Sequence, residues 1–508
     1  MTNGQNKPDA PALPVAHFPK QAVVVIHGMG EQMPMDTIKR FVGAAWETTT
    51  GLATPDLPNR TGVWSKPDVR TGSLELRRIT TRQTIPTTTF DKGVRTDFYE
   101  LYWADLSGGS TWDQVKAWIR GLLLRNPFTR VPRDVFLAWI VLWLITLTAI
   151  VFSIAAVLPH YATVGPWRPW DYVPLKWLYR WQAWELALTV AAMGLVVTNF
   201  IVPYFGRVVR YTRATPENIA ARAHIRQRGL ALLGELHDKE YARIVIVGHS
   251  LGAILAYDLV SYFWTRKPHA RVVTEGTAEF DALRDMEKAL AEPGWEKAAC
   301  DSGPPSPSVL KDYLAAQTRF GHLLRTRPMP DEKHPTDTRW LISDLITLGS
   351  PLGYAEFLMA GSRDDLRKRQ EDREYPTNPP LRELLDPGYE ADARRVNFPI
   401  DTEKPKLLAF PFENGQWQLH HAAPFAAVRW TNIHDPALLI AFGDLISSPA
   451  APVFGRAVID VNLKSLRGQS WRFTHTKYWR PPKRPADVPV HIAQLRKALD
   501  LGGTERAL

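Results

Sequence analysis

The chain has 508 residues, of which 45% are hydrophobic and 22% charged, so it can form a sizeable core and exceeds one average domain. Its single cysteine excludes an intramolecular disulfide and any zinc site built on several cysteines. The formal net charge of +10 comes without a nucleic-acid-binding motif, so we expect contact with a membrane surface and no nucleic-acid partner. Residues 1–20 are polar and proline-rich, which predicts a disordered lead-in and no secretory signal.

Residues 21–110 are predicted to be the first part of an α/β domain. The sequence QAVVVIHGMG at 21–30 is a short β-branched run that ends in glycines, which is typical of a buried parallel strand leading into a loop. The rest of this part is expected to contain a helix, a loop and two strands, at residues 34–49, 50–72, 73–80 and 96–106.

Residues 111–213 contain two long charge-free runs. Residues 135–158 are 24 positions without Asp, Glu, Lys or Arg, and residues 186–205 are 20 such positions. A helix needs about 20 apolar residues to cross the hydrocarbon core of a bilayer. Two buried core helices are the alternative, but such helices seldom stay uncharged for so long. We therefore predict a transmembrane hairpin.

The residues that flank the two runs indicate an orientation. The intervening segment 159–185 is rich in Trp and Tyr, which concentrate at membrane interfaces. Basic residues are more frequent outside the hairpin, which predicts that both termini and the α/β domain are cytoplasmic. Residues 112–124 mix apolar and basic side chains and are expected to form an amphipathic surface helix. The outer basic residues are Lys116, Arg120, Arg125, Arg130, Arg133, Arg207, Arg210 and Arg213.

Residues 214–480 are predicted to be the second part of the α/β domain. Apolar runs that alternate with amphipathic ones indicate a mostly parallel sheet flanked by helices. Helices are expected over 215–240, 251–263, 279–291 and 309–326, and strands over 243–247, within 340–353, at the end of 420–433, and over 457–463. Two insertions are expected, a helical cap-like one at about 265–340 and a charged surface one at about 361–405, with a C-terminal tail or helix at 481–508.

The strongest chemical signal is the G-x-S-x-G sequence formed by Gly248, His249, Ser250, Leu251 and Gly252. An apolar strand precedes it and a helix follows, which is the context that a nucleophile elbow requires. The serine must lie on a tight turn, and the small glycines allow the close approach of neighbouring segments. The N–H of Leu251 at the helix N-terminus is then a donor to a developing oxyanion.

The loop His27-Gly28-Met29-Gly30 directly after the first strand is predicted to supply the second oxyanion donor, from the N–H of Met29 or Gly28. A plain glycine turn is the alternative. His27 is expected to have a structural role beneath this loop.

A serine nucleophile needs a histidine and an acid later in the chain, in the order serine, acid, histidine. We favour His475, which lies in a predicted loop after the strand at 457–463. Asp444 and Asp435 both follow the preceding predicted strand, and we favour Asp444, because a Ser-Ser-Pro turn can present its carboxylate. His420 and His421 precede a strand and could line the site, and His491 opens a C-terminal helical run that is expected at the surface.

These motifs resemble those of the α/β-hydrolase superfamily, in particular its lipase-like branch. The similarity covers residues 21–30, 243–263, 341–355 and 420–480, and the sequence GDLISSP is similar to the acid segment of a group of bacterial membrane-associated hydrolases. That resemblance implies an α/β-hydrolase fold and supports Asp444 as the acid.

We therefore expect a membrane-anchored serine esterase or lipase that acts on an acyl-ester or lipid substrate in contact with membrane lipids. An acyltransferase with the same triad and a non-enzymatic membrane scaffold are the alternatives. No metal-ligand cluster and no dinucleotide-binding loop occurs in the sequence, so no metal or cofactor is expected.

Overall fold

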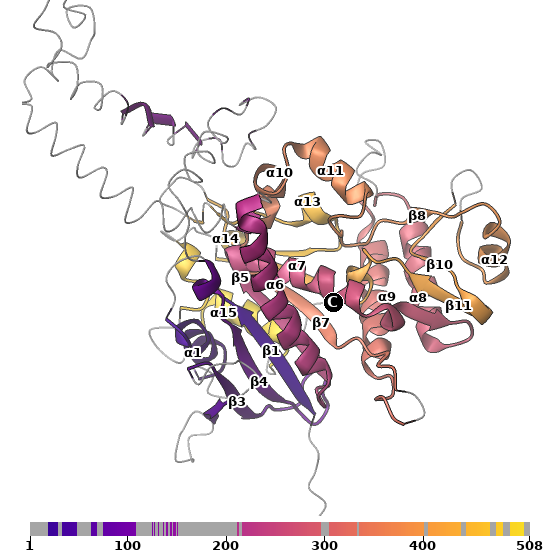
Figure 1. Cartoon of the computed structure of the whole chain (residues 1–508), viewed down its shortest axis with the longest axis horizontal. Coiled ribbons are helices and arrows are strands. Elements are labelled where there is room, and N and C mark those ends of the chain that lie inside the picture. Colours follow the sequence, from indigo (N-terminus) through magenta and orange to yellow (C-terminus); the bar gives the residue numbers. More distant parts are fainter. Residues whose placement is uncertain are drawn as a thin grey trace, which may run out of the picture.

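A computed structural model gives the structure of the protein (Figure 1). The residues that it describes are 19–28, 33–47, 62–68, 75–107, 211–212, 216–295, 304–332, 335–400, 405–437, 443–444, 446–467, 474–480 and 488–501, together with isolated positions between 124 and 150.

The described chain is an α/β structure around a mostly parallel sheet of eight strands, in the order β13-β12-β7-β5-β1-β4-β3-β2. The six strands from β13 to β4 are parallel, and β3 and β2 are added in antiparallel orientation at one edge. Their bounds are β1 Lys20–Ile26, β2 Val63–Pro67, β3 Arg77–Gln83, β4 Arg95–Leu101, β5 Arg243–His249, β7 Ile342–Leu348, β12 Arg429–His434 and β13 Ile459–Asn462.

The central strands are continuous apolar runs because both of their faces are covered. On one face, Val23 and Val245 pack with α1 (Asp36–Val42) and α15 (Val490–Leu499). A short π-helix, Gly43–Glu47, continues α1. On the other face, Val24 and Ile246 pack with α6 (Pro216–His237) and α7 (Leu251–Arg266). The alternation of side chains along each strand thus builds two separate cores, and it fixes the register of the sheet.

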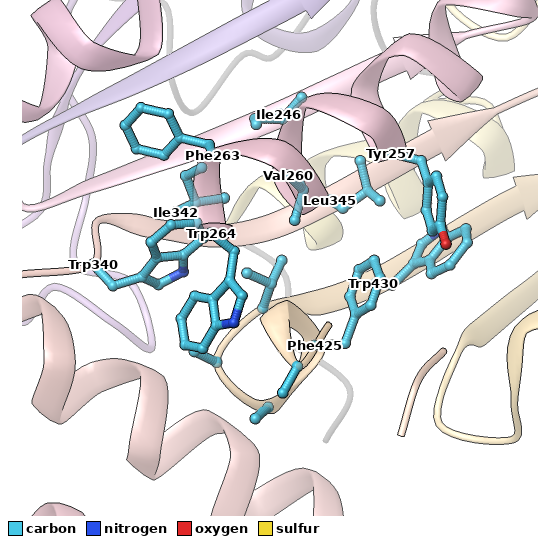
Figure 2. Close-up of a cluster of buried hydrophobic side chains, with 14 of the residues drawn as sticks. Ile246, Tyr257, Val260, Phe263, Trp264, Trp340, Ile342, Leu345, Phe425 and Trp430 are labelled. Carbon is cyan, nitrogen blue, oxygen red and sulfur yellow. The ribbon is translucent and has the colours of Figure 1, made fainter. Parts of the chain in front are cut away.

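Large aromatic side chains fill the core beneath α7 (Figure 2). Trp264 and Trp340 meet edge to face with ring centroids 4.9 Å apart, and Phe425 and Trp430 are stacked at 5.1 Å. Aromatic pairs of this kind contribute about 1 kcal/mol beyond their burial. Trp264 thus joins α7 to the residues just before β7, and Tyr257 of α7 contacts both Phe425 and, at the start of β12, Trp430. The helix α7 begins directly after Ser250.

A second layer lies beside α7, at the side of the molecule where Figure 1 labels α8 and α9. The helices α8 (Ala278–Ala291) and α9 (Pro307–Arg325) pack on each other, and short strands form a three-stranded and a two-stranded sheet. These strands are β6 Val272–Thr274, β8 Glu383–Leu384, β9 Lys406–Leu407, β10 Ala409–Pro411 and β11 Gln416–Leu419. The remaining short helices are α10 Ala355–Leu358, α11 Arg363–Glu371, α12 Glu390–Arg395, α13 Ala451–Phe454 and α14 Leu463–Arg467.

The segment predicted to form a membrane hairpin lies largely outside the described residues. Of the span 135–158 only isolated positions are described, and the span 186–205 and the helix at 112–124 fall almost wholly outside. Among the described residues, no helix combines the length and the apolarity needed to cross a membrane. Described residues near the two ends of this segment are in contact, because the rings of Trp103 and Tyr211 lie 6.2 Å apart between centroids.

Candidate active site

Ser250 occupies a tight turn between β5 and α7. Its backbone has φ 53° and ψ −128°, a conformation that a non-glycine residue adopts only where its surroundings impose it. The N–H of Ser250 donates to the carbonyl oxygen of Leu348 at 3.0 Å, which attaches the turn to the end of β7. Ser250 is therefore held at the carboxyl edge of the parallel strands, and it is only 1% exposed.

The two glycines of the motif are required by close backbone contacts. A Cβ at Gly248 would lie 2.6 Å from the Cα of Ala253, and a Cβ at Gly252 would lie 2.4 Å from the carbonyl oxygen of His27. Both neighbours are backbone atoms, which cannot rotate away as a side chain can. Gly252 thus allows α7 to pack against the end of β1, and Gly248 allows the start of α7 to pack against the turn at Ser250.

His475 reaches Ser250 from the far end of the sequence. It lies in a single turn of 3-10 helix, Thr474–Thr476, and its Nε2 is 2.9 Å from the Ser250 Oγ. Its Nδ1 is 3.0 Å from each carboxylate oxygen of Asp444. A carboxylate accepts and does not donate, so Nδ1 carries the proton and Nε2 is left to accept from the serine hydroxyl.

The carboxylate of Asp444 is fully enclosed, and its partners compensate the loss of water. Its Oδ1 accepts the N–H of Ile446 at 2.9 Å, and its Oδ2 accepts the hydroxyl of Tyr478 at 2.9 Å. The side chain of His475, by contrast, is 25% exposed, so the imidazole can be reached from outside. Both oxygens of the buried carboxylate therefore have hydrogen-bond donors, which offsets the cost of removing it from water.

Asp435, the alternative acid, is directed elsewhere. Its Oδ2 lies 2.7 Å from a guanidinium nitrogen of Arg467, and both side chains are buried. Only the carbonyl oxygen of Asp435 approaches the site, where it accepts the N–H of Asp444 at 2.9 Å. The structure therefore places Asp444, and not Asp435, against His475.

Two further side chains contact this site: Tyr478, which the sequence pattern did not reveal, and His249, which was predicted only as part of the G-x-S-x-G turn. The phenol of Tyr478 binds Asp444, and burial beside that carboxylate raises its pKa well above the ordinary value, so it remains a donor. The Nε2 of His249 donates to the carbonyl oxygen of His475 at 2.8 Å. Burial lowers the pKa of His249 to about 3, so its ring is neutral and holds the His475 backbone in place. Tyr478 is in the same HTKYW segment as His475, which was the only local signal for it.

The loop after β1 closes the site on the other side. A Cβ at Gly28 would lie 2.7 Å from the Cβ of Ser250, so this loop touches the serine directly. The N–H of Trp103 donates to the Nε2 of His27 at 3.1 Å, and the two rings stack with centroids 5.2 Å apart. His27 thus has the structural place expected of it. Met29 lies outside the described residues.

The amide of Leu251 opens α7 beside Ser250. As one of the first four amides of the helix it has no intrahelical acceptor. Gly28 and Leu251 therefore flank the serine from two elements, which is the placement that two oxyanion donors require.

The remaining candidate histidines have other partners. His420 binds the carbonyl oxygen of Leu381 at 3.0 Å, and burial lowers its pKa to about 3. His421 is adjacent to it and makes a ring contact with it. His491 was expected at the surface, but it is only 3% exposed, because α15 packs against the sheet, and its Nε2 faces the carbonyl oxygen of Arg480.

Within the described part of the chain, no group of three or more His, Cys, Asp or Glu side chains is placed to hold a metal ion. Comparisons of the chain with protein-family models, with curated proteins and with solved structures gave no match.

Proposed function

We propose that the protein is a serine hydrolase of the α/β-hydrolase type that cleaves a carboxylic ester at Ser250. The observation that carries this proposal is the chain of hydrogen bonds from Ser250 through His475 to Asp444. These residues come from three separate segments, and each distance is between 2.9 and 3.0 Å. A strained serine, a histidine with a free acceptor nitrogen and a buried carboxylate together are the parts of an activated nucleophile.

The first half of the reaction forms an acyl-enzyme. The Ser250 Oγ attacks the ester carbonyl carbon while its proton passes to the His475 Nε2. The carbonyl oxygen becomes an oxyanion, which the N–H groups of Leu251 and of Gly28 or Met29 stabilise. Collapse of the tetrahedral intermediate breaks the bond to the alcohol oxygen, and His475 returns its proton to that leaving group.

In the second half, water takes the place of the alcohol. His475 accepts a proton from the water as its oxygen attacks the acyl carbonyl, and collapse then releases the carboxylic acid and restores the Ser250 hydroxyl. Asp444 stabilises the imidazolium in both halves without taking its proton. Tyr478 and the Ile446 amide hold the Asp444 carboxylate in the orientation that this requires.

We further propose that residues 111–213 anchor the enzyme to a membrane, with the catalytic domain on the cytoplasmic side and a lipid or acyl ester as substrate. The charge-free runs at 135–158 and 186–205 support the anchor. The contact between Trp103 and Tyr211 supports a location close to the site, because Trp103 also binds His27 beneath the loop that touches Ser250. A lipid substrate would thus be delivered beside the reactive serine.

Hydrolysis of p-nitrophenyl esters by the full-length protein in a neutral detergent tests the proposal. We expect turnover by the wild type and by Ser261→Ala, and loss of turnover in Ser250→Ala and His475→Ala. Ser261 is a matched control, because it lies on the same helix, α7, and its hydroxyl donates to the backbone carbonyl oxygen of Tyr257. Turnover that survives in Ser250→Ala, or that is absent from folded wild type with esters of every chain length, would contradict the proposal.

A further inference from the structure

A cavity of about 740 Å³ that is open to solvent lies between α11, α13, β13 and the start of α9, and neither Ser250 nor its partners line it. Figure 1 shows α11 and α13 at the same end of the molecule. Its wall includes Ala451, Pro452 and Arg456, which lie in the chain after the turn that carries Asp444. The cavity contributes no group to the hydrogen-bonded chain at Ser250, and the proposed ester chemistry does not use it.

Three arginines face this cavity. Arg363 and Arg367 are one helical turn apart on α11, so they lie on the same side of that helix, and Arg456 follows α13. The guanidinium of Arg363 has one long, exposed contact of 3.9 Å with Glu356. The side chains of Arg367 and Arg456 make no hydrogen bond or ion pair with another described residue. Two of the three guanidinium groups in the lining therefore have no partner among the described residues.

The one acidic residue of the lining is already engaged. Asp460 accepts from the side-chain amide of Asn432 at 2.7 Å and from the N–H groups of Ala450 and Ala451, each at 2.9 Å. Its carboxylate thus caps the start of α13 and does not approach any arginine within ion-pair distance in the described structure. Even when Asp460 is counted in full, three arginines against one aspartate leave an excess of two positive charges in the lining.

The rest of the lining is apolar. Leu310 at the first turn of α9 and three prolines form a wall without charge, at Pro304, Pro305 and Pro452. The cavity therefore combines a cationic side with an apolar side. A purely ionic ligand would leave the second side in water, and a purely apolar ligand would leave the arginines unused.

We propose that this cavity binds an amphiphile with a phosphate-monoester head group, which contacts Arg363, Arg367 and Arg456 while its alkyl part lies on Leu310 and the prolines. A phosphate monoester carries about −1.5 to −2 charge near pH 7, which matches the excess charge of the lining. Guanidinium groups bind phosphate oxygens in pairs through parallel N–H donors. The same chemistry is offered by the head group of phosphatidic acid and by a soluble alkyl phosphate.

Calorimetric titration of the full-length protein in neutral detergent with hexyl phosphate, inorganic phosphate and hexanol tests this site. We expect hexyl phosphate to bind more tightly than inorganic phosphate, and hexanol not to bind measurably. Its affinity should fall as salt is raised, because exposed charge pairs are screened. A wild type that does not bind hexyl phosphate at millimolar concentration, or that binds hexanol equally well, would overturn the proposal.

Variants locate the binding. Each charge-assisted hydrogen bond contributes enough for about a tenfold loss of affinity, so Arg367→Gln should weaken binding about tenfold and the double change with Arg456→Gln further. Lys368→Gln is the matched control, since it removes one positive charge from the same helix outside the cavity, and it should change the affinity less than about twofold by loss of a screened surface charge. Equal effects of Arg367→Gln and Lys368→Gln would show that only surface charge matters and would overturn the site. Because Arg367 is exposed, Arg367→Gln should fold, and it tests the site even if the double variant does not fold.

Competition identifies the source of the head group. Vesicles of phosphatidylcholine with phosphatidic acid should displace hexyl phosphate if a membrane lipid reaches the cavity, whereas vesicles of phosphatidylcholine alone should not. Retention of hexyl phosphate in the presence of both kinds of vesicle would assign the cavity to a soluble alkyl phosphate. Displacement by phosphatidylcholine alone would contradict recognition of the phosphate monoester.

Discussion

At the scale of single residues, Asp444 and Asp435 are both buried carboxylates at the end of β12, yet one faces His475 and the other Arg467. Asp444→Asn should lower kcat by about 10⁴-fold with little loss of stability, because the amide favours the wrong imidazole tautomer. Asp435→Asn should leave kcat nearly unchanged and lower the free energy of unfolding by about 3 kcal/mol, because it leaves Arg467 buried without its counter-charge. Ester kinetics and denaturant unfolding of both variants measure the contrast, and a larger kinetic effect from Asp435→Asn would reverse the assignment.

Tyr478 is a positioning residue in this account, since its hydroxyl contacts Asp444 and not the serine. Tyr478→Phe removes one hydrogen bond to a charged group, which corresponds to about 2 kcal/mol. We expect kcat to fall by about tenfold or more with KM unchanged, and the lower limb of the pH–rate profile to shift as the carboxylate loses its donor. If Tyr478 had only a structural role, Tyr478→Phe would lower the melting temperature without shifting the lower limb of the pH–rate profile.

At the scale of elements, the junction of α7 with β1 depends on Gly252, whereas a Cβ added at Gly234 in α6 would meet no atom within 4 Å. Gly252→Ala should destabilise the protein and abolish activity, because the new methyl group meets the backbone of His27. Gly234→Ala should raise the free energy of unfolding by about 1 kcal/mol, because alanine has the higher helix propensity. Chemical denaturation of the two variants checks the opposite signs, and an active, stable Gly252→Ala would contradict the packing described for the turn.

The link between α8 and β9 predicts a pH dependence of stability. Glu287 on α8 is fully buried and accepts the N–H of Leu408 at 2.5 Å, and burial raises its pKa to about 7 from 4.5. The folded state therefore binds more protons than the unfolded state between pH 4.5 and 7, and the titration of Glu287 alone lowers stability by about 3 kcal/mol as the pH rises through that window. Burial raises the pKa of Glu100 to about 7 as well, so Glu100 adds a second decline in the same window.

Glu287→Gln removes the titrating group and keeps an acceptor for Leu408. Unfolding curves between pH 4.5 and 7 should show a smaller decline for this variant than for the wild type, with the remainder attributable to Glu100. An identical decline in both proteins would mean that Glu287 is charged in the folded state.

The central strands and long helices could be predicted from the sequence because each carries its own apolar pattern. The strands β1, β5 and β7 are continuous apolar runs, and α8 and α9 have amphipathic periodicity. The strand β2 lies within the predicted loop at 50–72, because it is an exposed edge strand that ends in proline and has no buried face to mark it. The short strands of the smaller sheets were missed for a related reason, since four of the five have only two or three residues and form no period.

The candidate active site could be predicted from the sequence only in part, for a different physical reason. Ser250 lies in a local motif, and the order of the chain pointed to a late histidine and acid. The choice between Asp444 and Asp435, and the contributions of Tyr478 and His249, depend on which segments meet after folding. No spacing in the sequence encodes those contacts.

At the scale of the whole molecule, the proposed anchor predicts how the protein fractionates. The full-length chain should remain with membranes after carbonate washing, because two apolar spans are held by burial in lipid. Since Trp103 and Tyr211 are in contact, residues 111–208 can be replaced by a short Gly-Ser linker. That variant should enter the soluble fraction and keep its ester hydrolysis. Release of the full-length chain by carbonate would contradict the proposed anchor, and the proposal for the catalytic triad would be unaffected.

Covalent labelling is the most direct test that Ser250 is an activated nucleophile. The full-length protein in neutral detergent is treated with a fluorophosphonate, and the modified peptide is mapped by mass spectrometry. We expect one adduct on Ser250, a rate of labelling that falls sharply in His475→Ala and Asp444→Asn, and an unchanged rate in Ser261→Ala. An adduct on another serine, or no adduct on the folded wild type, would contradict it.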